Sequence, residues 1–308
     1  MERAYLGGTS VSRIILGCGN FGGIGSSPAF YGQGESREQA FALMDAAWAA
    51  GITTFDTADA YGGGRSETYI GEWVAARRPE GLVLTTKTFN PMGEGEDHGL
   101  APARVRRQLE TSLRRLGVER VDLFLCHDWD ADVAVGETAG VLDELVREGK
   151  IGAYGLSNVD GAQLRESLAA GSFAWVQNSY SLLDRGAEEE VLPLCVEHGL
   201  GFTPFSPLAG GWLTGKYRRE APAPEGSRMT LRPEPYAHLR ADTVYDALER
   251  LAAIGDPATL AFAWLLAQPA VTAVVVGPRR PEHLEPALAA FETTVDVEAV
   301  GALFPPTR

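Results

Sequence analysis

The sequence contains few cysteines and no long apolar segment. Only 3 of its 308 residues are cysteine, at positions 18, 126 and 195, and none of them forms a C-x-x-C pair. Free thiols in a reducing cytoplasm are the simplest interpretation. No Cys/His pair has metal-ligand spacing, so no metal is expected. No apolar run approaches the roughly 18 residues of a membrane span, and no apolar stretch follows basic residues at the N-terminus as in a secretory signal.

Positive charge is also scarce. Lys and Arg total 27 against 41 Asp and Glu, which gives a formal net charge of −14. The basic residues are scattered or occur in pairs such as Arg279-Arg280. A chain this acidic repels a phosphate backbone unless it concentrates its basic residues on one surface. Nucleic acid is therefore not an expected partner.

What the sequence does contain is a regular alternation of short apolar and longer amphipathic segments. The short segments are rich in Val, Ile, Leu, Phe and Thr and mostly lack in/out alternation, which is typical of strands covered on both faces. They span residues 14–17, 53–56, 82–87, 121–127, 151–157, 175–180, 201–205 and 271–277. Helical periodicity, with caps and glycine stops, marks residues 36–50, 101–116, 138–148, 160–170, 188–198, 258–268 and 281–291.

Eight strands, nearly all followed by a helix, predict a parallel α/β barrel of the (β/α)8 or TIM type. We expect one domain over residues 1–308, because no linker or repeat interrupts the pattern. Residues 4–12, with Gly7-Gly8 in the middle, predict an N-terminal β-hairpin. Residues 208–241, rich in Gly, Pro and Arg, predict a long irregular loop after the seventh strand.

Four chemically complementary side chains follow the second, third and fourth predicted strands: Asp56, Tyr61, Lys87 and His127. Active sites of such barrels lie at the carboxyl ends of the strands, so these residues should converge. A phenol, with a pKa of about 10, is a poor proton donor at neutral pH. A neighbouring ammonium lowers that pKa, a buried carboxylate holds the ammonium, and an imidazole can orient a carbonyl oxygen. The set predicts proton transfer to a carbonyl compound.

Each of these residues has a structural interpretation when taken alone. Asp56 can pair with any cation, Lys87 can be a solvated strand end, and Tyr61 can be a surface aromatic. His127 can be a strand-end histidine, or a metal ligand if Asp128 and Asp130 joined it. Only their convergence at one barrel mouth favours the catalytic interpretation.

Several ordered segments resemble the aldo-keto reductase superfamily, especially its bacterial members related to the potassium-channel β-subunits and aflatoxin-aldehyde reductases. The resemblance lies in residues 56–67, 87, 121–127, 155–158, 177–185 and 203–217. It implies a TIM barrel that binds a nicotinamide dinucleotide without a Rossmann domain. It also implies NADPH-dependent reduction of an aldehyde or ketone to an alcohol.

The resemblance further implies roles for individual residues. Tyr61 would be the general acid, Lys87 would lower its pKa, Asp56 would pair with Lys87, and His127 would orient the carbonyl. The implied cofactor contacts are Ser157, Asn158 and Gln177 on the carboxamide, Phe205 on the nicotinamide ring, Ser206, Leu208 and Gly210 on the pyrophosphate, and Gly277, Arg279, Arg280 and His283 at the adenosine phosphate. The family often has Arg or Gln where this chain has His283, and Asn where it has Ala287, so the preference for NADP over NAD stays open.

Two further features are ambiguous. Residues 17–22 read G-x-G-x-x-G after a strand, but a Rossmann site needs a helix to start at that turn, and the next predicted helix begins only near Ser36. A turn at the barrel mouth, with Gly19 and Asn20 near cofactor and substrate, is the better interpretation. Trp129 and Trp212 either wall the substrate pocket or pack the loops down.

Three functional questions also stay open. The same site could run oxidatively on a sugar or polyol, or the chain could be a cofactor-binding, redox-sensing regulatory subunit. The physiological substrate is not identifiable from the sequence. A homo-oligomer is possible.

Overall fold

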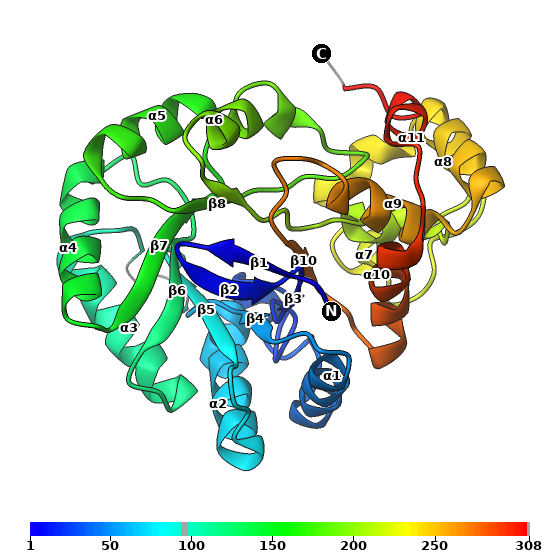
Figure 1. Cartoon of the computed structure of the whole chain (residues 1–308). Coiled ribbons are helices and arrows are strands. Elements are labelled where there is room, and N and C mark those ends of the chain that lie inside the picture. Colours follow the sequence, from blue (N-terminus) through cyan, green and yellow to red (C-terminus); the bar gives the residue numbers. More distant parts are fainter. Residues whose placement is uncertain (94–97, 307–308) are drawn as a thin grey trace.

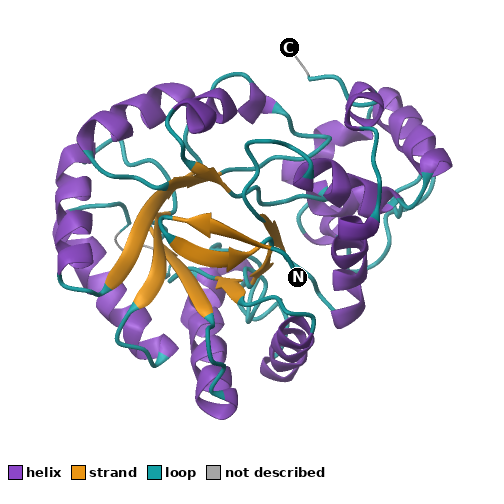
Figure 2. Cartoon of the chain, in the orientation of Figure 1, coloured by secondary structure: helices purple, strands orange, loops and turns teal. Residues whose placement is uncertain are grey.

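The computed structural model describes residues 1–93 and 98–306, and a sheet of parallel strands forms its centre. Helices surround this sheet (Figure 1 and Figure 2). The eight strands are β3 (Ile14–Gly17), β4 (Thr54–Asp56), β5 (Val83–Thr88), β6 (Val121–Cys126), β7 (Ile151–Ser157), β8 (Trp175–Gln177), β9 (Gly201–Phe202) and β10 (Val274–Val276). Their order is β10-β3-β4-β5-β6-β7-β8-β9, with every neighbouring pair parallel. All eight predicted strands are confirmed.

The two edges of the sheet meet and close the barrel. The Thr272 amide donates to the Phe202 carbonyl oxygen at 2.8 Å, and the Val275 amide donates to the Pro204 carbonyl oxygen at 2.9 Å. These bonds join the segment after β9 to the segment around β10. The predicted (β/α)8 fold is therefore confirmed, and the carboxyl ends of all strands share one mouth.

The helices follow local capping chemistry. Ser36 and Gln39 form a capping box at the start of α1, and Asp160 and Gln163 form another at the start of α5. The main helices are α1 (Arg37–Ala49), α2 (Arg65–Arg77), α3 (Pro102–Leu116), α4 (Val135–Arg147), α5 (Gly161–Ala170), α6 (Val191–Glu197), α8 (Asp242–Ile254), α9 (Pro257–Leu266), α10 (Glu285–Ala289) and α11 (Val297–Ala302). The sequence analysis did not predict α2, because its first turn lies inside the segment read as a loop. No helix starts at residues 17–22, which excludes the Rossmann interpretation.

The N-terminal hairpin plugs the amino end of the barrel. It consists of β1 (Arg3–Leu6) and β2 (Thr9–Ser12), as predicted, and lies across the barrel in Figure 1. Leu6 and Val11 share one buried cluster with barrel residues that include Leu125, Trp175 and Val275. Because this end is filled, the carboxyl-terminal mouth is the end that holds the cavity described below.

The segment after β9 is more ordered than the predicted irregular loop. It contains η4 (Ala209–Thr214), the short helix α7 (Arg228–Leu231) and η5 (Glu234–Arg240) before α8 begins. Trp212, which is 1% exposed, anchors η4 by packing against Tyr217 and Tyr245 at ring-centroid distances of 5.0 and 5.5 Å. An aromatic contact with α8 therefore holds this segment over the barrel mouth.

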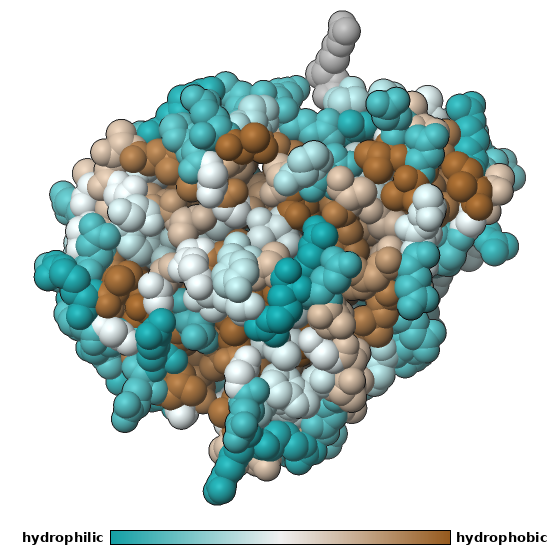
Figure 3. Space-filling model, in the orientation of Figure 1, coloured by the Kyte–Doolittle hydropathy of each residue, from teal (hydrophilic) through white to brown (hydrophobic). Residues whose placement is uncertain are grey.

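Within residues 1–93 and 98–306 no helix is long and apolar enough to cross a membrane. The apolar residues on the face seen in Figure 3 lie in separate groups among hydrophilic ones. The possible homo-oligomer stays a prediction.

The contact between α2 and α3 provides a test of the packing. A Cβ atom on Gly71 of α2 would lie 2.1 Å from the carbonyl oxygen of Arg115 in α3. We expect Gly71→Ala to lower the free energy of unfolding by about 1–3 kcal/mol, because the backbones must move apart. Gly140 of α4 is exposed, and its Cβ would meet nothing within 4 Å. Gly140→Ala should therefore raise that free energy by up to about 1 kcal/mol. Urea unfolding of both variants is the measurement, and equal shifts would contradict this account.

Candidate active site

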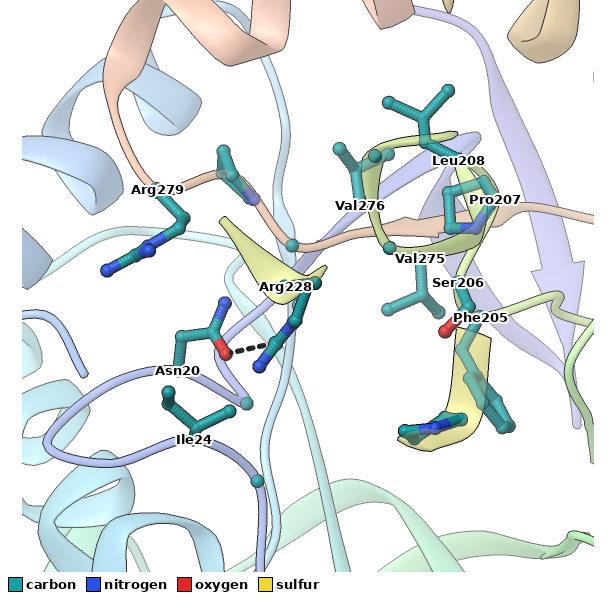
Figure 4. A pocket seen from close by; sticks show the side chains of 18 of the residues that line it. Asn20, Ile24, Phe205, Ser206, Pro207, Leu208, Arg228, Val275, Val276 and Arg279 are labelled. Carbon is teal, nitrogen blue, oxygen red and sulfur yellow. Dashed lines mark hydrogen bonds between the residues drawn. The ribbon is translucent and has the colours of Figure 1, made fainter. Parts of the chain in front are cut away.

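A cavity of about 1010 Å³ occupies the carboxyl-terminal mouth of the barrel. Figure 4 shows part of its wall. Nearly all of the predicted site residues line it: Gly19, Asn20, Asp56, Tyr61, His127, Ser157, Asn158, Gln177, Phe205, Ser206, Leu208, Gly210, Gly277, Arg279 and His283. These residues lie at the carboxyl ends of seven of the eight strands or in the loops that follow them, which is why their convergence follows from the parallel barrel.

A buried ion pair joins Asp56, which lines this cavity, to Lys87 behind it. Lys87, at the end of β5, is 0% exposed, and its ammonium donates to Asp56 and, at 2.9 Å, to the carbonyl oxygen of Thr57. The second carboxylate oxygen of Asp56 accepts from the Gln177 amide at 3.0 Å. Strands β4, β5 and β8 are thus linked through their side chains beneath the site.

Tyr61 lies directly above this pair. The Lys87 Nζ is 5.1 Å from the centroid of the Tyr61 ring. The Tyr61 hydroxyl and the His127 Nε2 are 3.3 Å apart, and the two rings meet edge to face. Gly62 allows this placement, because its φ is 58° and a Cβ there would lie 2.5 Å from the carbonyl oxygen of Phe21. The four predicted catalytic side chains are therefore adjacent.

Burial and the charge of Lys87 set the protonation of this group. Burial raises the pKa of Tyr61, and the Lys87 ammonium acts against that rise without reversing it. Lys87 therefore has the predicted lowering effect on the Tyr61 pKa, but burial outweighs it. Burial, and then Lys87, hold the pKa of His127 well below its usual range, so its imidazole is neutral near pH 7. Burial disfavours the charge of Lys87, but Asp56 and Tyr61 outweigh it and raise the Lys87 pKa.

The structure adds Asn90, which the sequence analysis missed. Its side-chain amide lies 3.3 Å from His127 Nδ1 and lines the cavity. Because a neutral imidazole that accepts at Nδ1 carries its proton on Nε2, His127 presents an N–H toward Tyr61 and the cavity. Asn90 lies three positions after Lys87 at the same strand end, so a search of all polar residues at the strand ends would have found it.

A buried arginine holds Asn90 in place. Arg104 of α3 donates to the Asn90 carbonyl oxygen at 2.9 Å and to the Thr88 hydroxyl at 3.0 Å. Thr88 in turn donates to Asp59 at 2.6 Å, on the loop that carries Tyr61. Burial, and then the neighbouring Glu67, raise the pKa of Asp59 to about 7. The loops bearing Tyr61 and Asn90 are therefore connected by one hydrogen-bonded network.

Residues 205–211 form one wall of the cavity and have an unusual backbone. Ser206 and Ala209 adopt φ values of 55° and 46°, which are unusual for residues with side chains. A Cβ on Gly210 would lie 2.6 Å from the ring of Tyr236, so only glycine fits beneath that ring. Two consecutive glycines, Gly210 and Gly211, beside a large cavity fit the close approach of a pyrophosphate.

Three cationic side chains, Lys216, Arg228 and Arg279, line the cavity. Arg279 donates to the buried carboxylate of Glu35 and to the carbonyl oxygen of Gly226, each at 2.8 Å. Arg228 donates to the Asn20 side-chain oxygen at 2.7 Å, the dashed line in Figure 4. Lys216 also lines the cavity, and burial, then Arg279 and Arg228, lower its pKa. The sequence analysis missed Glu35, Lys216 and Arg228, because it searched only the segment around β10 for charges near the cofactor.

Three predicted contacts are not brought into the cavity. Trp212 packs against α8, as described above, and Trp129 packs against the main hydrophobic core. Neither lines the cavity. Arg280 also lies outside it, with a 72% exposed side chain whose nearest carboxylate is Glu282 at 3.8 Å. Trp129 and Trp212 both bury apolar surface against the core, so they act as packing residues.

Metal binding receives no support from the side-chain clusters. Among the described residues, no group of three or more His, Cys, Asp and Glu side chains could hold an ion. All three cysteines are free and buried.

A barrel with this cavity and this buried set of side chains defines a class of oxidoreductases, and the chain belongs to the aldo/keto reductase family. The model of that family matches residues 13–303. The family resemblance is confirmed, whereas the branch suggested by the sequence stays a prediction.

Two curated relatives cover nearly the whole chain. The uncharacterized oxidoreductase YrpG of Bacillus subtilis (strain 168) is 35% identical over 324 residues, with 98% of this chain and 95% of the relative covered. The NADH-specific methylglyoxal reductase of Escherichia coli (strain K12) is 32% identical over 311 residues, with 94% of each covered.

Solved structures have the same fold. A glycerol dehydrogenase from Gluconobacter oxydans superimposes with a TM-score of 0.82 at 26% identity, covering 98% of this chain and 93% of that one. The holo form of an aldo-keto reductase from Bacillus halodurans gives a TM-score of 0.79 at 27% identity, covering 99% and 95%.

The contact between Asn90 and His127 can be tested without an activity assay. We expect Asn90→Asp to raise the pKa of His127, because a carboxylate beside Nδ1 favours the imidazolium. Asn90→Ala should leave the imidazole neutral but free to exchange its proton between the two nitrogens. The measurement is a pH titration of ¹⁵N-labelled imidazoles by NMR, with the exposed His198 as internal reference. An unchanged His127 titration in Asn90→Asp would contradict the contact.

Proposed function

We propose that this protein is an NADPH-dependent carbonyl reductase with Tyr61 as the general acid. The proposal rests above all on the Tyr61 hydroxyl, which lies 3.3 Å from a neutral imidazole and above the buried Lys87–Asp56 pair, on the floor of a large cavity. Membership of the aldo/keto reductase family supports oxidoreductase chemistry at a carbonyl or alcohol carbon.

The cavity wall fits a nicotinamide dinucleotide. Ser157, Asn158 and Gln177 supply polar groups for the carboxamide, and the half-buried ring of Phe205 supplies a stacking surface. The strained backbone of residues 206–211 lies where phosphate oxygens would approach. When bound, the reduced nicotinamide supplies a hydride to the carbonyl carbon.

The remaining steps belong to the protein. Neutral His127 donates its Nε2 proton in a hydrogen bond to the carbonyl oxygen and so positions it. Tyr61 transfers its proton to that oxygen as the alcohol forms. The Lys87 ammonium stabilises the resulting tyrosinate, and Asp56 keeps Lys87 charged in a site without water access to its ammonium.

Our preference for NADPH rests on the cation cluster. Lys216, Arg228 and Arg279 all line the cavity, and we place the adenosine ribose beside Arg279. The planar guanidinium of Arg279 suits a 2′-phosphate. Glu35 pairs with Arg279 and partly neutralises it, which weakens the preference for NADPH. One relative is named as an NADH-specific reductase. The cofactor preference therefore depends on how far Arg279 is neutralised.

The same residues can also run the reaction in reverse. The likeness to a structure named as a glycerol dehydrogenase favours oxidation of a polyol as the second candidate function. In that direction Tyr61 would accept the proton that it donates in reduction. A regulatory subunit that only holds the cofactor is the third alternative, and it predicts binding without turnover.

A substitution of Tyr61 tests the general acid. Tyr61→Phe should keep cofactor binding and lose roughly 10²-fold or more in kcat, the range for removed general-acid catalysis. The matched control is Tyr69→Phe, on α2 and outside the cavity. Absorbance of NADPH at saturating substrate is the measurement, over a panel of aldehydes, ketones and sugars. Turnover near the wild-type rate in Tyr61→Phe would sink the assignment. Cofactor binding without turnover of any carbonyl by the wild type would favour the regulatory subunit.

A second substitution tests the cofactor preference. We combine Arg279→Ala with Glu35→Gln, so that no buried carboxylate is left unpaired. Charge-assisted hydrogen bonds are worth about 1.5–3 kcal/mol, or roughly ten- to a hundredfold in affinity. The double variant should weaken NADPH binding by that factor and leave NADH binding nearly unchanged. Arg280→Ala, exposed and outside the cavity, is the control. Equal losses for both cofactors in a fluorescence titration would show that Arg279 does not recognise the 2′-phosphate.

A further inference from the structure

One part of the cavity is not used by the proposed catalytic and cofactor residues. Its walls are the loop that precedes η1 (Pro28–Phe30) and the segment between α7 and η5. The polar side chains of these walls are Ser26, Ser27 and Arg232. One of these walls is linked to Tyr61 through Gly19, because the Tyr61 ring lies 3.5 Å from the position of a Cβ on Gly19 and the Gly19 carbonyl oxygen accepts from Gly25 of the loop before η1.

Arg232 reaches into this compartment from the end of α7. Its Nη1 lies 4.0 Å from the position that a Cβ on Gly25 would take, and its guanidinium carbon is 5.7 Å from the centroid of the Phe30 ring. The Gly25 amide donates to the Gly19 carbonyl oxygen at 2.7 Å, and the Gly62 amide donates to the Gly25 carbonyl oxygen at 3.2 Å. Gly19 lies beside the Tyr61 ring and Gly62 follows Tyr61 in the sequence, so Gly25 connects the surroundings of Arg232 to the loop that carries the general acid.

The guanidinium of Arg232 has unused donors. Its side chain is half-buried, and within residues 1–93 and 98–306 it makes no hydrogen bond and no ion pair. Arg228, one turn earlier, is bonded to Asn20, and Arg279 is paired with Glu35. An arginine fork that is partly withdrawn from water and faces a cavity is suited to a carboxylate or phosphate, which it binds through two parallel hydrogen bonds.

A serine on the opposite wall is also available to a ligand. Ser27 occupies the N-cap position of η1, but its side chain does not cap that turn. A serine hydroxyl can donate to an anionic oxygen. Arg232 and Ser27 thus provide cationic and hydroxyl donors on two segments that line the same cavity.

We propose that the substrate is a short aldehyde or ketone that also carries an anionic group, a carboxylate or a phosphate, and that Arg232 binds this group. The proposal rests on the function proposed above, with the carbonyl held at Tyr61 and His127. The anionic group takes no part in the reaction. Hydride adds to the carbonyl carbon, the oxygen receives the Tyr61 proton, and the nicotinamide is oxidised.

The test compares matched pairs of probes with the full chain and saturating NADPH. Succinic semialdehyde is paired with butanal, and glyceraldehyde 3-phosphate with glyceraldehyde, so that each pair differs in the anionic group. We expect the wild type to have the higher kcat/KM for the anionic member. Arg232→Met should lower that kcat/KM roughly ten- to a hundredfold through KM, and change the neutral member much less. The pair that responds tells whether a carboxylate or a phosphate is bound.

Arg240→Met is the matched control, because Arg240 is exposed, lies on η5 and is outside the cavity. It should change neither probe. The proposal is overturned if Arg232→Met slows both members of a pair equally, or if it weakens NADPH binding instead, which would make Arg232 a cofactor residue. A wild type that reduces neutral carbonyls with no preference for the anionic member also overturns it and leaves the proposed function standing. If no probe is reduced at all, the proposed function fails, and this proposal fails with it.

Discussion

The buried ion pair of Lys87 and Asp56 is the interaction on which the active site depends. A fully buried ammonium is costly to desolvate, and it persists only where its donors are satisfied. Lys87 meets this condition through Asp56 and Thr57, and Asp56 meets it through Gln177. These partners lie at the ends of different strands or directly after them, so the pair can form only where parallel strands end at one level. Barrel closure is therefore a requirement of the chemistry as well as of the fold.

The charge of Lys87 acts differently on its two titratable neighbours. At His127 it adds to the effect of burial, and both lower the pKa, so the imidazole stays neutral. At Tyr61 it opposes burial, which alone would raise the pKa of the phenol further. A single cation thus keeps one neighbour a neutral hydrogen-bond donor and limits the cost of forming a tyrosinate at the other. Asn90 completes the arrangement, because it determines which imidazole nitrogen carries the proton.

Features that depend on local sequence were predictable, and features that depend on long-range contacts were not. All eight strands, the hairpin and the four catalytic candidates follow from apolar runs, turn residues and positions at strand ends. Arg280 was expected at the adenosine phosphate but lies outside the cavity, and the role of Trp212 could not be decided, because their neighbours in the sequence do not reveal which side of the chain faces the cavity. The contacts of Asn20 with Arg228 and of Glu35 with Arg279 join residues 208 and 244 positions apart. No periodicity or spacing encodes such pairs.

Positive side chains gather at the cavity, although the whole chain carries a net negative charge. The net charge of −14 repels dinucleotides and other anions at long range. Lys216, Arg228, Arg232 and Arg279 nevertheless gather at the cavity wall. Arg228 and Arg279 have different hydrogen-bond partners. Arg228 is held by a neutral amide and keeps its full charge, whereas Arg279 is held by the carboxylate of Glu35. Because burial already raises the pKa of Glu35, a second anion at Arg279 would raise it further and favour its protonation. Glu35 is therefore the residue whose charge decides how much of the positive potential remains for a bound phosphate.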